Sequence, residues 1–249
     1  MLLRRITKHV RDQNWFAVWL DFVIVVVGVF IGIQVANWNE SRANRTEYLH
    51  ALDRLEAEIV DNLAIIERED LLIGNTVNIA RAGLDVLLAC TDGAEAVART
   101  NAAIAEARGT RGIQLQFPAL RELTTNSILL SEQSDAERKR FAALLFRLEL
   151  ARETSARFEP ITLREWPAHT PTLAIGPAAK HEGVYFGQAY EIQRYPLVLN
   201  VDMTTACKDK ELLKWLHTWE VWQSNVTLYH QQLRHEHLET QKLIQGIKR

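Results

Sequence analysis

The hydrophobic positions near the N-terminus form one uninterrupted block. Residues 22–39 contain no charged side chain, and nine of these 18 positions are Val or Ile. As a helix the block would be about 27 Å long, which matches a bilayer hydrocarbon core of about 30 Å. A surface helix of a soluble protein keeps a polar face, and this block has none. The pattern predicts a transmembrane anchor over residues 15–39; a buried core helix is the alternative.

Tryptophans stand at both ends of the predicted anchor. Trp15 and Trp19 precede the apolar block and Trp38 closes it, as expected of an interface belt in which the indole ring is apolar and its N–H meets water. A cleaved signal peptide is the other possibility, because basic residues precede the block. The block is longer than a usual signal core, and Gln34 and Asn37 stand where cleavage needs small residues. We therefore expect the anchor to remain uncleaved.

Charge on the two flanks sets the expected orientation. The head, residues 1–14, holds four basic side chains and one acidic one, whereas the basic residues after the anchor are offset by Glu40 and Glu47. Short flanks rich in Lys and Arg stay in the cytoplasm. We therefore expect a cytoplasmic head and an exported domain over residues 40–249. In a bacterium this is a single-pass protein of the inner membrane with a periplasmic domain.

One face of the anchor carries small residues. Gly28, Gly32 and Ala36 repeat every four positions, and Asp21 falls on the same face. Such a face lets two helix backbones approach closely in a bilayer, so the anchor is a candidate site of homo-oligomerisation. Gly is also common in spanning helices for other reasons. Asp21 is interpreted as an interfacial or pairing residue rather than a proton carrier.

Two later stretches carry apolar residues at alternating spacings of three and four, which predicts long helices. The first covers residues 45–89, where Asn62 and Asp70 break the apolar stripe and Gly74 could bend the helix. The second covers residues 208–247, with apolar positions Leu212, Trp215, Trp219, Trp222, Val226, Tyr229 and Leu233. Large rings at helical spacing favour core packing over a ligand platform, because they bury the most area per residue.

Shorter helices are expected between the two long ones. Their predicted ranges are 94–108, 118–130 and 134–157, the last opened by a capping box of Ser134 and Glu137. Pro and Gly are few, and Leu, Ala, Glu and Arg are frequent, which favours helix throughout. The predicted fold class is all-α: a transmembrane helix that continues into an elongated helical bundle with two long antiparallel helices.

Residues 160–201 lack helical periodicity. They contain five of the six prolines together with several glycines, so we expect a largely irregular segment with loops, short helices and a short strand near residues 195–201. A long irregular segment inside a packed domain is a candidate binding surface. An inert connector is the alternative.

The two cysteines acquire a role from the predicted helices. Cys90 ends the first long helix and Cys207 precedes the last, so an antiparallel pair would bring them together at the end far from the membrane. In an oxidising compartment we expect a disulfide. It would close a loop of more than 100 residues, for which the chain-entropy model gives at most about 4 to 5 kcal/mol. Two unrelated buried thiols are the alternative.

Charge and motifs exclude several functions. The net charge is −2, and the part after the head is mildly acidic, so no basic surface for nucleic acid is expected. Phosphate-loop, dinucleotide and serine-hydrolase motifs are absent from the sequence. His230 and His237 share one helical face, while His235 and Glu239 share another, so they do not converge on a metal. We expect a solvated polar helix end there, and no catalytic, metal or cofactor site.

The stretch "IGIQVANWNESR" carries a resemblance. A basic head, a Val/Ile-rich span and a closing Ile-Gln-x-x-Asn-Trp-Asn resemble the N-terminal signature of a bacterial family of uncharacterised single-pass membrane proteins, a domain of unknown function. The resemblance rests on residues 21–39, and its most specific positions are Gly28, Gly32, Gln34, Asn37, Trp38 and Asn39. The segment "FPALRELTTNSILLSEQSDAERKRFAALL" resembles the family's helical hairpin. It departs at residues 126–128, where members often have Gly and a basic residue. The resemblance implies no activity.

These patterns together favour a protein that acts by binding. The expected function is that of a membrane-anchored interaction or scaffold protein, whose partners are the lipid bilayer, an unidentified envelope protein and a second copy of the chain. A single-pass sensor is a second possibility. Because a head of about 14 residues is too short for an output domain, a sensor would signal through a membrane partner. An enzyme with an unrecognised site in residues 160–201 is a third.

Overall fold

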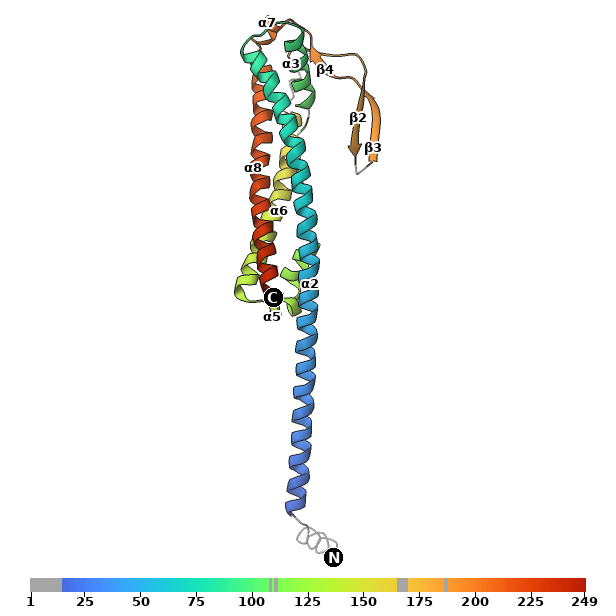
Figure 1. Ribbon diagram of the computed structural model, residues 1–249, viewed down its shortest axis with the longest axis vertical. Coiled ribbons are helices and arrows are strands. Elements are labelled where there is room, and N and C mark those ends of the chain that lie inside the picture. Colours follow the sequence, from blue (N-terminus) through green and yellow to red (C-terminus); the bar gives the residue numbers. More distant parts are fainter. Residues whose placement is uncertain (1–14, 108, 110–111, 165–169, 186–187) are drawn as a thin grey trace, which may run out of the picture.

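The protein is an elongated helical bundle at one end of a very long helix (Figure 1). The computed structural model describes residues 15–107, 109, 112–164, 170–185 and 188–249. The helices are α2 (Trp15–Leu88), α3 (Ala94–Glu106), α4 (Pro118–Thr125), α5 (Ser127–Glu132), α6 (Asp135–Arg164), α7 (Met203–Ala206) and α8 (Lys210–Ile247). The strands are β1 (Leu173–Ile175), β2 (Ala179–Tyr185), β3 (Gln188–Arg194) and β4 (Leu197–Leu199). The all-α prediction is confirmed in its main features.

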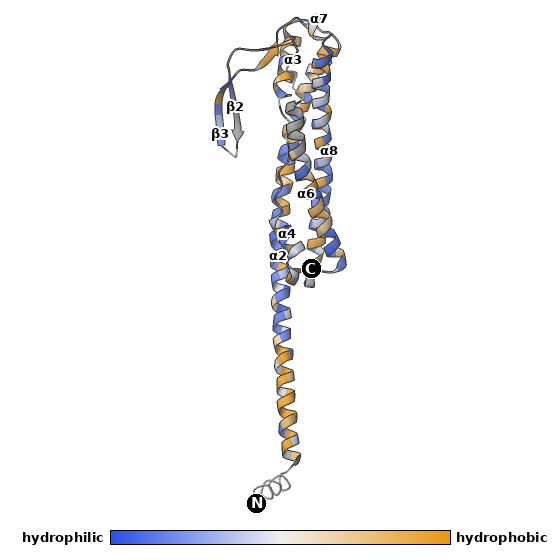
Figure 2. Ribbon diagram, turned by 180° about the vertical axis from the view of Figure 1, so that it is seen from behind, coloured by the Kyte–Doolittle hydropathy of each residue, from blue (hydrophilic) through white to orange (hydrophobic). Residues whose placement is uncertain are grey.

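Helix α2 runs without interruption through 74 residues. It joins the apolar block to the first predicted long helix, and Gly74 does not break it. The described apolar side chains between residues 16 and 38 are exposed except for the half-buried Val23, and Figure 2 shows this part of α2 as a hydrophobic stretch below the bundle. By length and composition, α2 holds the one candidate membrane span among the described residues. The head, residues 1–14, lies outside the described part of the chain.

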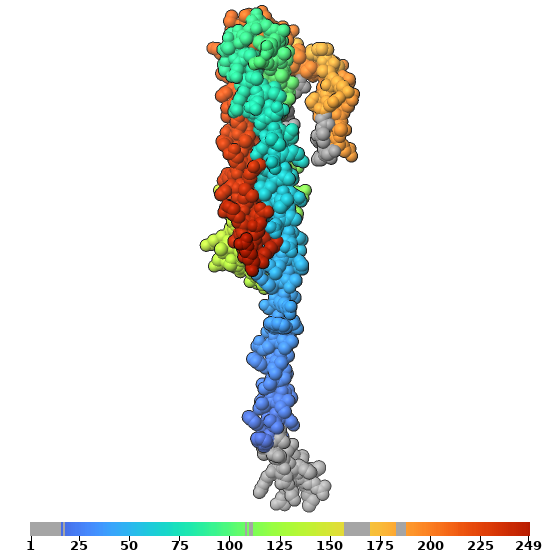
Figure 3. Space-filling model, in the orientation of Figure 1, coloured from blue at the N-terminus to red at the C-terminus, as the bar shows by residue number. Residues whose placement is uncertain are grey.

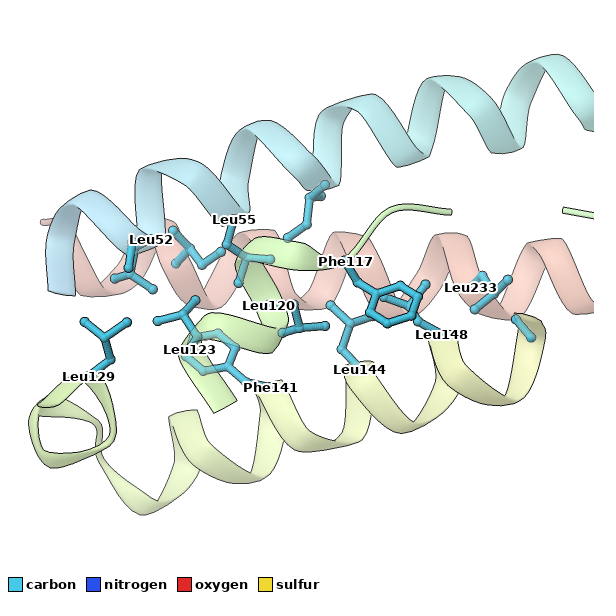
Figure 4. Packing of buried hydrophobic residues seen from close by; sticks show 14 of the residues in the cluster. Leu52, Leu55, Phe117, Leu120, Leu123, Leu129, Phe141, Leu144, Leu148 and Leu233 are labelled. Atoms are coloured by element: carbon cyan, nitrogen blue, oxygen red, sulfur yellow. The ribbon is translucent and has the colours of Figure 1, made fainter. Parts of the chain in front are cut away.

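The bundle packs α8 antiparallel to α2, with α6 against α8 (Figures 1 and 3). Its larger core lies at the end nearer the apolar block and joins α2, α4, α5, α6 and α8. Figure 4 shows leucines of these helices around Phe117 and Phe141. Each fully buried leucine contributes roughly 1.5 to 3 kcal/mol to folding. The Glu58 carboxylate on α2 accepts hydrogen bonds from the backbone N–H of Ala119 and Leu120, which holds the start of α4.

A second core closes the far end of the bundle. Trp215 and Trp219 of α8 pack there with Ile104 of α3 and Met203 of α7. Cys90 and Cys207 are joined beside this core with an S–S distance of 2.09 Å. The disulfide expected from the antiparallel arrangement of the two long helices is therefore present in the structure. The residue with positive φ directly after α2 is Cys90 (φ 47), and Gly93 (φ 109) directly precedes α3.

Several predicted boundaries differ from the structure. The helix expected over residues 118–130 is two helices, because Asn126 leaves the helical conformation and its side chain caps α5 by accepting from the Ile128 N–H. The capping box is present, with the N–H of Glu137 donating to Oγ of Ser134 at 3.3 Å. Helix α6 continues seven residues beyond the predicted end, Arg157, to Arg164.

The segment 160–201 is more regular than predicted. It forms two antiparallel ribbons, in which Leu173 pairs with Leu199 (β1 and β4) and Gly183 pairs with Tyr190 (β2 and β3). The β1–β4 ribbon lies against the far core, and the β2–β3 ribbon projects away from the bundle (Figure 1). The expected short strand near residues 195–201 is β4. Within the described part of this segment, four strands stand where a largely irregular chain was expected, because the backbone pairing of the strands requires no side-chain periodicity.

Candidate ligand pocket

Asn62 and Asp70, the two polar residues that interrupt the apolar stripe of α2, both contact α8. Asn62 is 1% exposed. Its Nδ2 donates to the carbonyl of Gln116 at 2.7 Å, and its Oδ1 accepts from the Gln116 N–H at 3.0 Å. The same Nδ2 lies 3.3 Å from Nε2 of His237 on α8. Asn62 therefore ties the segment before α4 to both long helices.

Asp70 makes the second contact. Its Oδ1 lies 2.6 Å from Nδ1 of His230, whose side chain is 1% exposed. Arg234 approaches the other carboxylate oxygen at 3.9 Å. His237 is also fully buried. The expected solvated helix end was therefore wrong for His230 and His237, because the face they share is turned to α2. His235 is exposed as expected, and Glu239 pairs with Lys242 at 2.7 Å.

A pocket of about 230 Å³ opens next to His230, between α6, α8 and residues 112–113. Its walls are formed by Gly112, Ile113, Ala151, Thr154, Ser155, Trp222, Asn225, Val226, Tyr229 and His230. Trp222, Val226 and Tyr229 were predicted as core positions; all three are half-buried pocket walls, and Tyr229 also packs against the larger core. The remainder of that stripe, Leu212, Trp215, Trp219 and Leu233, is buried as predicted.

Hydrogen bonds hold the chain over one side of the pocket. Nε1 of Trp219 donates to the Gly109 carbonyl at 2.8 Å, and the Ile113 N–H donates to Oγ of Ser155 at 3.2 Å. A Cβ at Gly112 would lie 2.9 Å from Cβ of Ser155, so this close approach requires glycine. These contacts hold Gly112 and Ile113 against α6.

The polar groups of the pocket define what it can do chemically. The contact between Asp70 and His230 is a hydrogen bond in which the Nδ1–H of the ring donates to the carboxylate. Nε2 is buried, and within the described residues it makes no hydrogen bond. Asp70, His230 and Ser155 are the residue types of a hydrolytic triad. Among the described residues, the serine–histidine hydrogen bond of such a triad is not formed.

The residues predicted for the anchor lie apart from this pocket. A Cβ at Gly28 or at Gly32 would meet nothing within 4 Å. Asp21, Ala36, Trp19 and Trp38 are exposed along the same segment, and Arg42 lies over the Trp38 ring at 5.8 Å. The side chain of Trp15 lies outside the described part of the chain. The anchor face is thus open along its described length.

Sequence reasoning missed the pocket and the buried polar pairs beside it, and only the pairs left a signal in the sequence. Asn62 faces His237 and Asp70 faces His230. In an antiparallel pair of helices, a residue later in α2 lies beside a residue earlier in α8. Arg81 with Glu220 and Asp53 with Lys248 follow the same register. A break in one apolar stripe that matches a polar residue in an antiparallel stripe indicates a buried polar pair.

No protein-family model, curated protein or solved structure matches this chain.

Proposed function

We propose that this protein is a single-pass inner-membrane protein of bacteria whose exported helical domain binds a small ligand. The observation that carries the proposal is the pocket beside His230, because the histidine in its wall is bonded to Asp70 on α2. The same helix continues into the apolar segment. A ligand at the pocket would act on a residue pair that joins α8 to the membrane helix, as a sensor requires.

The membrane topology is part of the proposal. The uncharged stretch of 18 residues, its tryptophans and the basic head support a cytoplasmic N-terminus. The Cys90–Cys207 disulfide supports an exported domain, since disulfides persist in oxidising compartments. A periplasm-active reporter fused after Arg249 is expected to give signal. Signal only from a cytoplasm-active reporter at that position would refute the orientation.

A role as an interaction protein is the second candidate. The β2–β3 ribbon projects from the bundle, and the described side chains of β3 are exposed except for the half-buried Tyr190 (Figure 1). Ribbon edges carry unpaired backbone groups that can pair with a strand of another chain. In-cell photo-cross-linking from Gln193 is expected to capture an envelope protein if the ribbon recruits one. Capture equal to that from exposed Asn75 on α2 would exclude a specific role of the ribbon.

Ligand binding is tested with the full chain in lipid nanodiscs. Fragments that bind are expected to raise its melting temperature. Thr154 is half-buried in the pocket wall, so Thr154→Phe fills the cavity and should abolish the shifts. Ala156→Phe places the same ring on the exposed side of α6 and should retain them. Fragment shifts that persist in Thr154→Phe, or no shift with the wild-type chain, would remove the pocket from the function.

A further inference from the structure

Exposed apolar side chains follow the outer side of the α2–α8 pair, where Figure 3 shows the two helices lying side by side. Leu71 of α2 is 73% exposed, and Leu228 of α8 is 63% exposed. Asp70 and His230 are in contact at 2.6 Å. Leu71 directly follows the first of these residues, and Leu228 precedes the second by two positions. The two exposed leucines therefore lie at the same level along the pair.

The same arrangement recurs at a level nearer the apolar segment. Asn62 lies 3.3 Å from His237. Val60 precedes Asn62 by two positions, Leu238 directly follows His237, and both apolar side chains are exposed. Single exposed apolar residues are normal, whereas a set that gathers on one side of a molecule marks an interaction surface.

On α2, these apolar residues belong to a stripe of exposed positions at alternating spacings of three and four. The stripe consists of Ala57, Val60, Ala64, Glu67, Leu71, Gly74 and Asn78. A separate, buried stripe of the same helix, which includes Ile59, Ile66 and Ile73, faces the core. Since the first stripe is exposed, packing within the described bundle does not require its seven-residue repeat. Such a repeat keeps one side of a helix in line with a partner helix in a coiled coil.

The stripe continues into the apolar segment with the same spacing. The added positions, all exposed, are Gly32, Ala36, Asn39, Ala43, Thr46, His50 and Asp53. None of the stripe positions from residue 32 to residue 78 is Lys or Arg. A Cβ at Gly32 or at Gly74 would meet nothing within 4 Å, so a second helix backbone has room to approach at both levels. One partner helix can therefore follow α2 from the apolar segment to Asn78.

We propose that this outer face, the α2 stripe from Ala57 to Asn78 together with Leu228 and Leu238, binds the same face of a second copy of this chain. Two copies anchored in one membrane stand parallel and at equal height, so each stripe position meets its own counterpart, as a parallel two-helix coiled coil requires. Glu67 then meets Glu67, a polar core position of the kind that fixes the register of a coiled coil at a cost in stability. The inference takes the membrane topology from the proposed function and makes no use of the pocket.

Cysteine cross-linking of the full chain in cell membranes tests the contact. Leu71→Cys places a thiol on the stripe, and Leu72→Cys places one on the next residue, which is also exposed but points about 100° away. The native cysteines are joined to each other, so the new thiol is the one that oxidation links. Because a disulfide needs Cα atoms within about 7 Å, Leu71→Cys should form a dimer at least about fivefold more efficiently than Leu72→Cys.

A charged substitution tests the same face in a membrane two-hybrid assay. Leu71→Lys should weaken self-association about tenfold or more, since the burial of a leucine from each copy is lost. Leu72→Lys is the matched control and should have little effect. Because Leu71 is exposed in the single chain, the substitution does not disturb the fold.

The outcomes separate this inference from the ligand-binding function. Equal cross-linking of Leu71→Cys and Leu72→Cys, or unchanged association of Leu71→Lys, would overturn the proposal, even if Gly32→Ile weakens association through the apolar segment. A cross-linked product that lacks a second copy of the chain would assign the face to another protein and would overturn it too. Thr154→Phe should leave the Leu71→Cys dimer unchanged, so loss of ligand binding and loss of self-association are distinct results.

Discussion

At the scale of single residues, the polar positions inside the long helices carry the most information. Asn62 and Asp70 interrupt the apolar stripe of α2, and each is satisfied by a partner outside α2. The stripe itself was predictable from spacing, because buried positions of a helix recur every three to four residues. The partners were not, because they depend on the register between helices that are more than 150 residues apart along the chain.

Two glycines of α2 should respond oppositely to the same substitution. A Cβ at Gly83 would lie 2.3 Å from Cβ of Ala103 on α3, whereas a Cβ at Gly74 would meet nothing within 4 Å. Gly83→Ala is expected to destabilise the protein by about 1 to 3 kcal/mol through overpacking. Gly74→Ala should stabilise it by about 0.5 to 1 kcal/mol, because alanine loses less backbone entropy in a helix. Guanidinium unfolding followed by circular dichroism measures both. Equal effects would contradict the close α2–α3 contact.

The buried His237 should make stability depend on pH. Burial lowers the pKa of His237, and the nearby Arg140 adds to this, against the opposing hydrogen bond to the Leu233 carbonyl. Because the folded pKa lies below the unfolded value of about 6.5, the unfolded chain binds the proton first as pH falls. The free energy of unfolding should therefore decrease from about pH 6.5 down to the folded pKa.

Substitution isolates the contribution of this histidine. His237→Gln should flatten the decrease in unfolding free energy over that pH range, whereas His235→Gln should leave it unchanged, since His235 is exposed on the same helix. Chemical denaturation at successive pH values is the measurement. An unaltered slope in His237→Gln would show that other groups cause the dependence.

At the scale of elements, helices were predictable and ribbons were not. The ranges of α2 and α8 and the start of α6 followed from apolar periodicity and caps, which are local properties of the sequence. Strand β2, with the sequence AKHEGVY, has no clear alternation of apolar and polar residues. The backbone N–H and C=O groups of β2 pair with those of β3, and this pairing does not require a particular pattern of side chains. The division at Asn126 was missed for a related reason, since a single side-chain cap decides it.

The disulfide should contribute a large part of the stability. It closes a loop with a sequence separation of 117 residues, for which chain entropy gives a contribution of up to about 5 kcal/mol. Cys90→Ser and Cys207→Ser should lower the free energy of unfolding by similar amounts. Reductant should bring the wild-type chain to the level of the variants and leave the variants unchanged. A reductant effect in the variants would point to a different thiol reaction.

At the scale of the whole molecule, the shape follows from the continuity of α2. The predicted anchor and the first predicted long helix form one continuous helix. The bundle packs only against the part of α2 beyond residue 47 (Figures 1 and 2). The overall architecture was predictable from the order of apolar blocks along the chain. The pocket was not, because it arises where α6, α8 and residues 112–113 pack incompletely, and this depends on tertiary geometry alone.

The open face of the apolar segment leads to a prediction about self-association. If the segment spans a membrane as proposed, Gly28 and Gly32 let a second copy approach closely. Gly32→Ile should then reduce association of the full chain in a membrane two-hybrid assay about fivefold or more, since two-helix coupling is worth on the order of 1 kcal/mol. Val26→Ile, on the other side of the segment, is the control and should have little effect. Unchanged association in Gly32→Ile would exclude this face.

The two ends of α8 determine which motions remain available to the domain. A disulfide fixes the beginning of α8 to the end of α2, and Lys248 at its other end pairs with Asp53 and Glu56 of α2 at 2.6 Å each. The disulfide opposes sliding of α8 along α2 at one end, and the partly exposed ion pairs at the other end contribute little. If α2 spans a membrane as proposed, a ligand that separates His230 from Asp70 should therefore change the tilt or rotation of α2 more readily than its height.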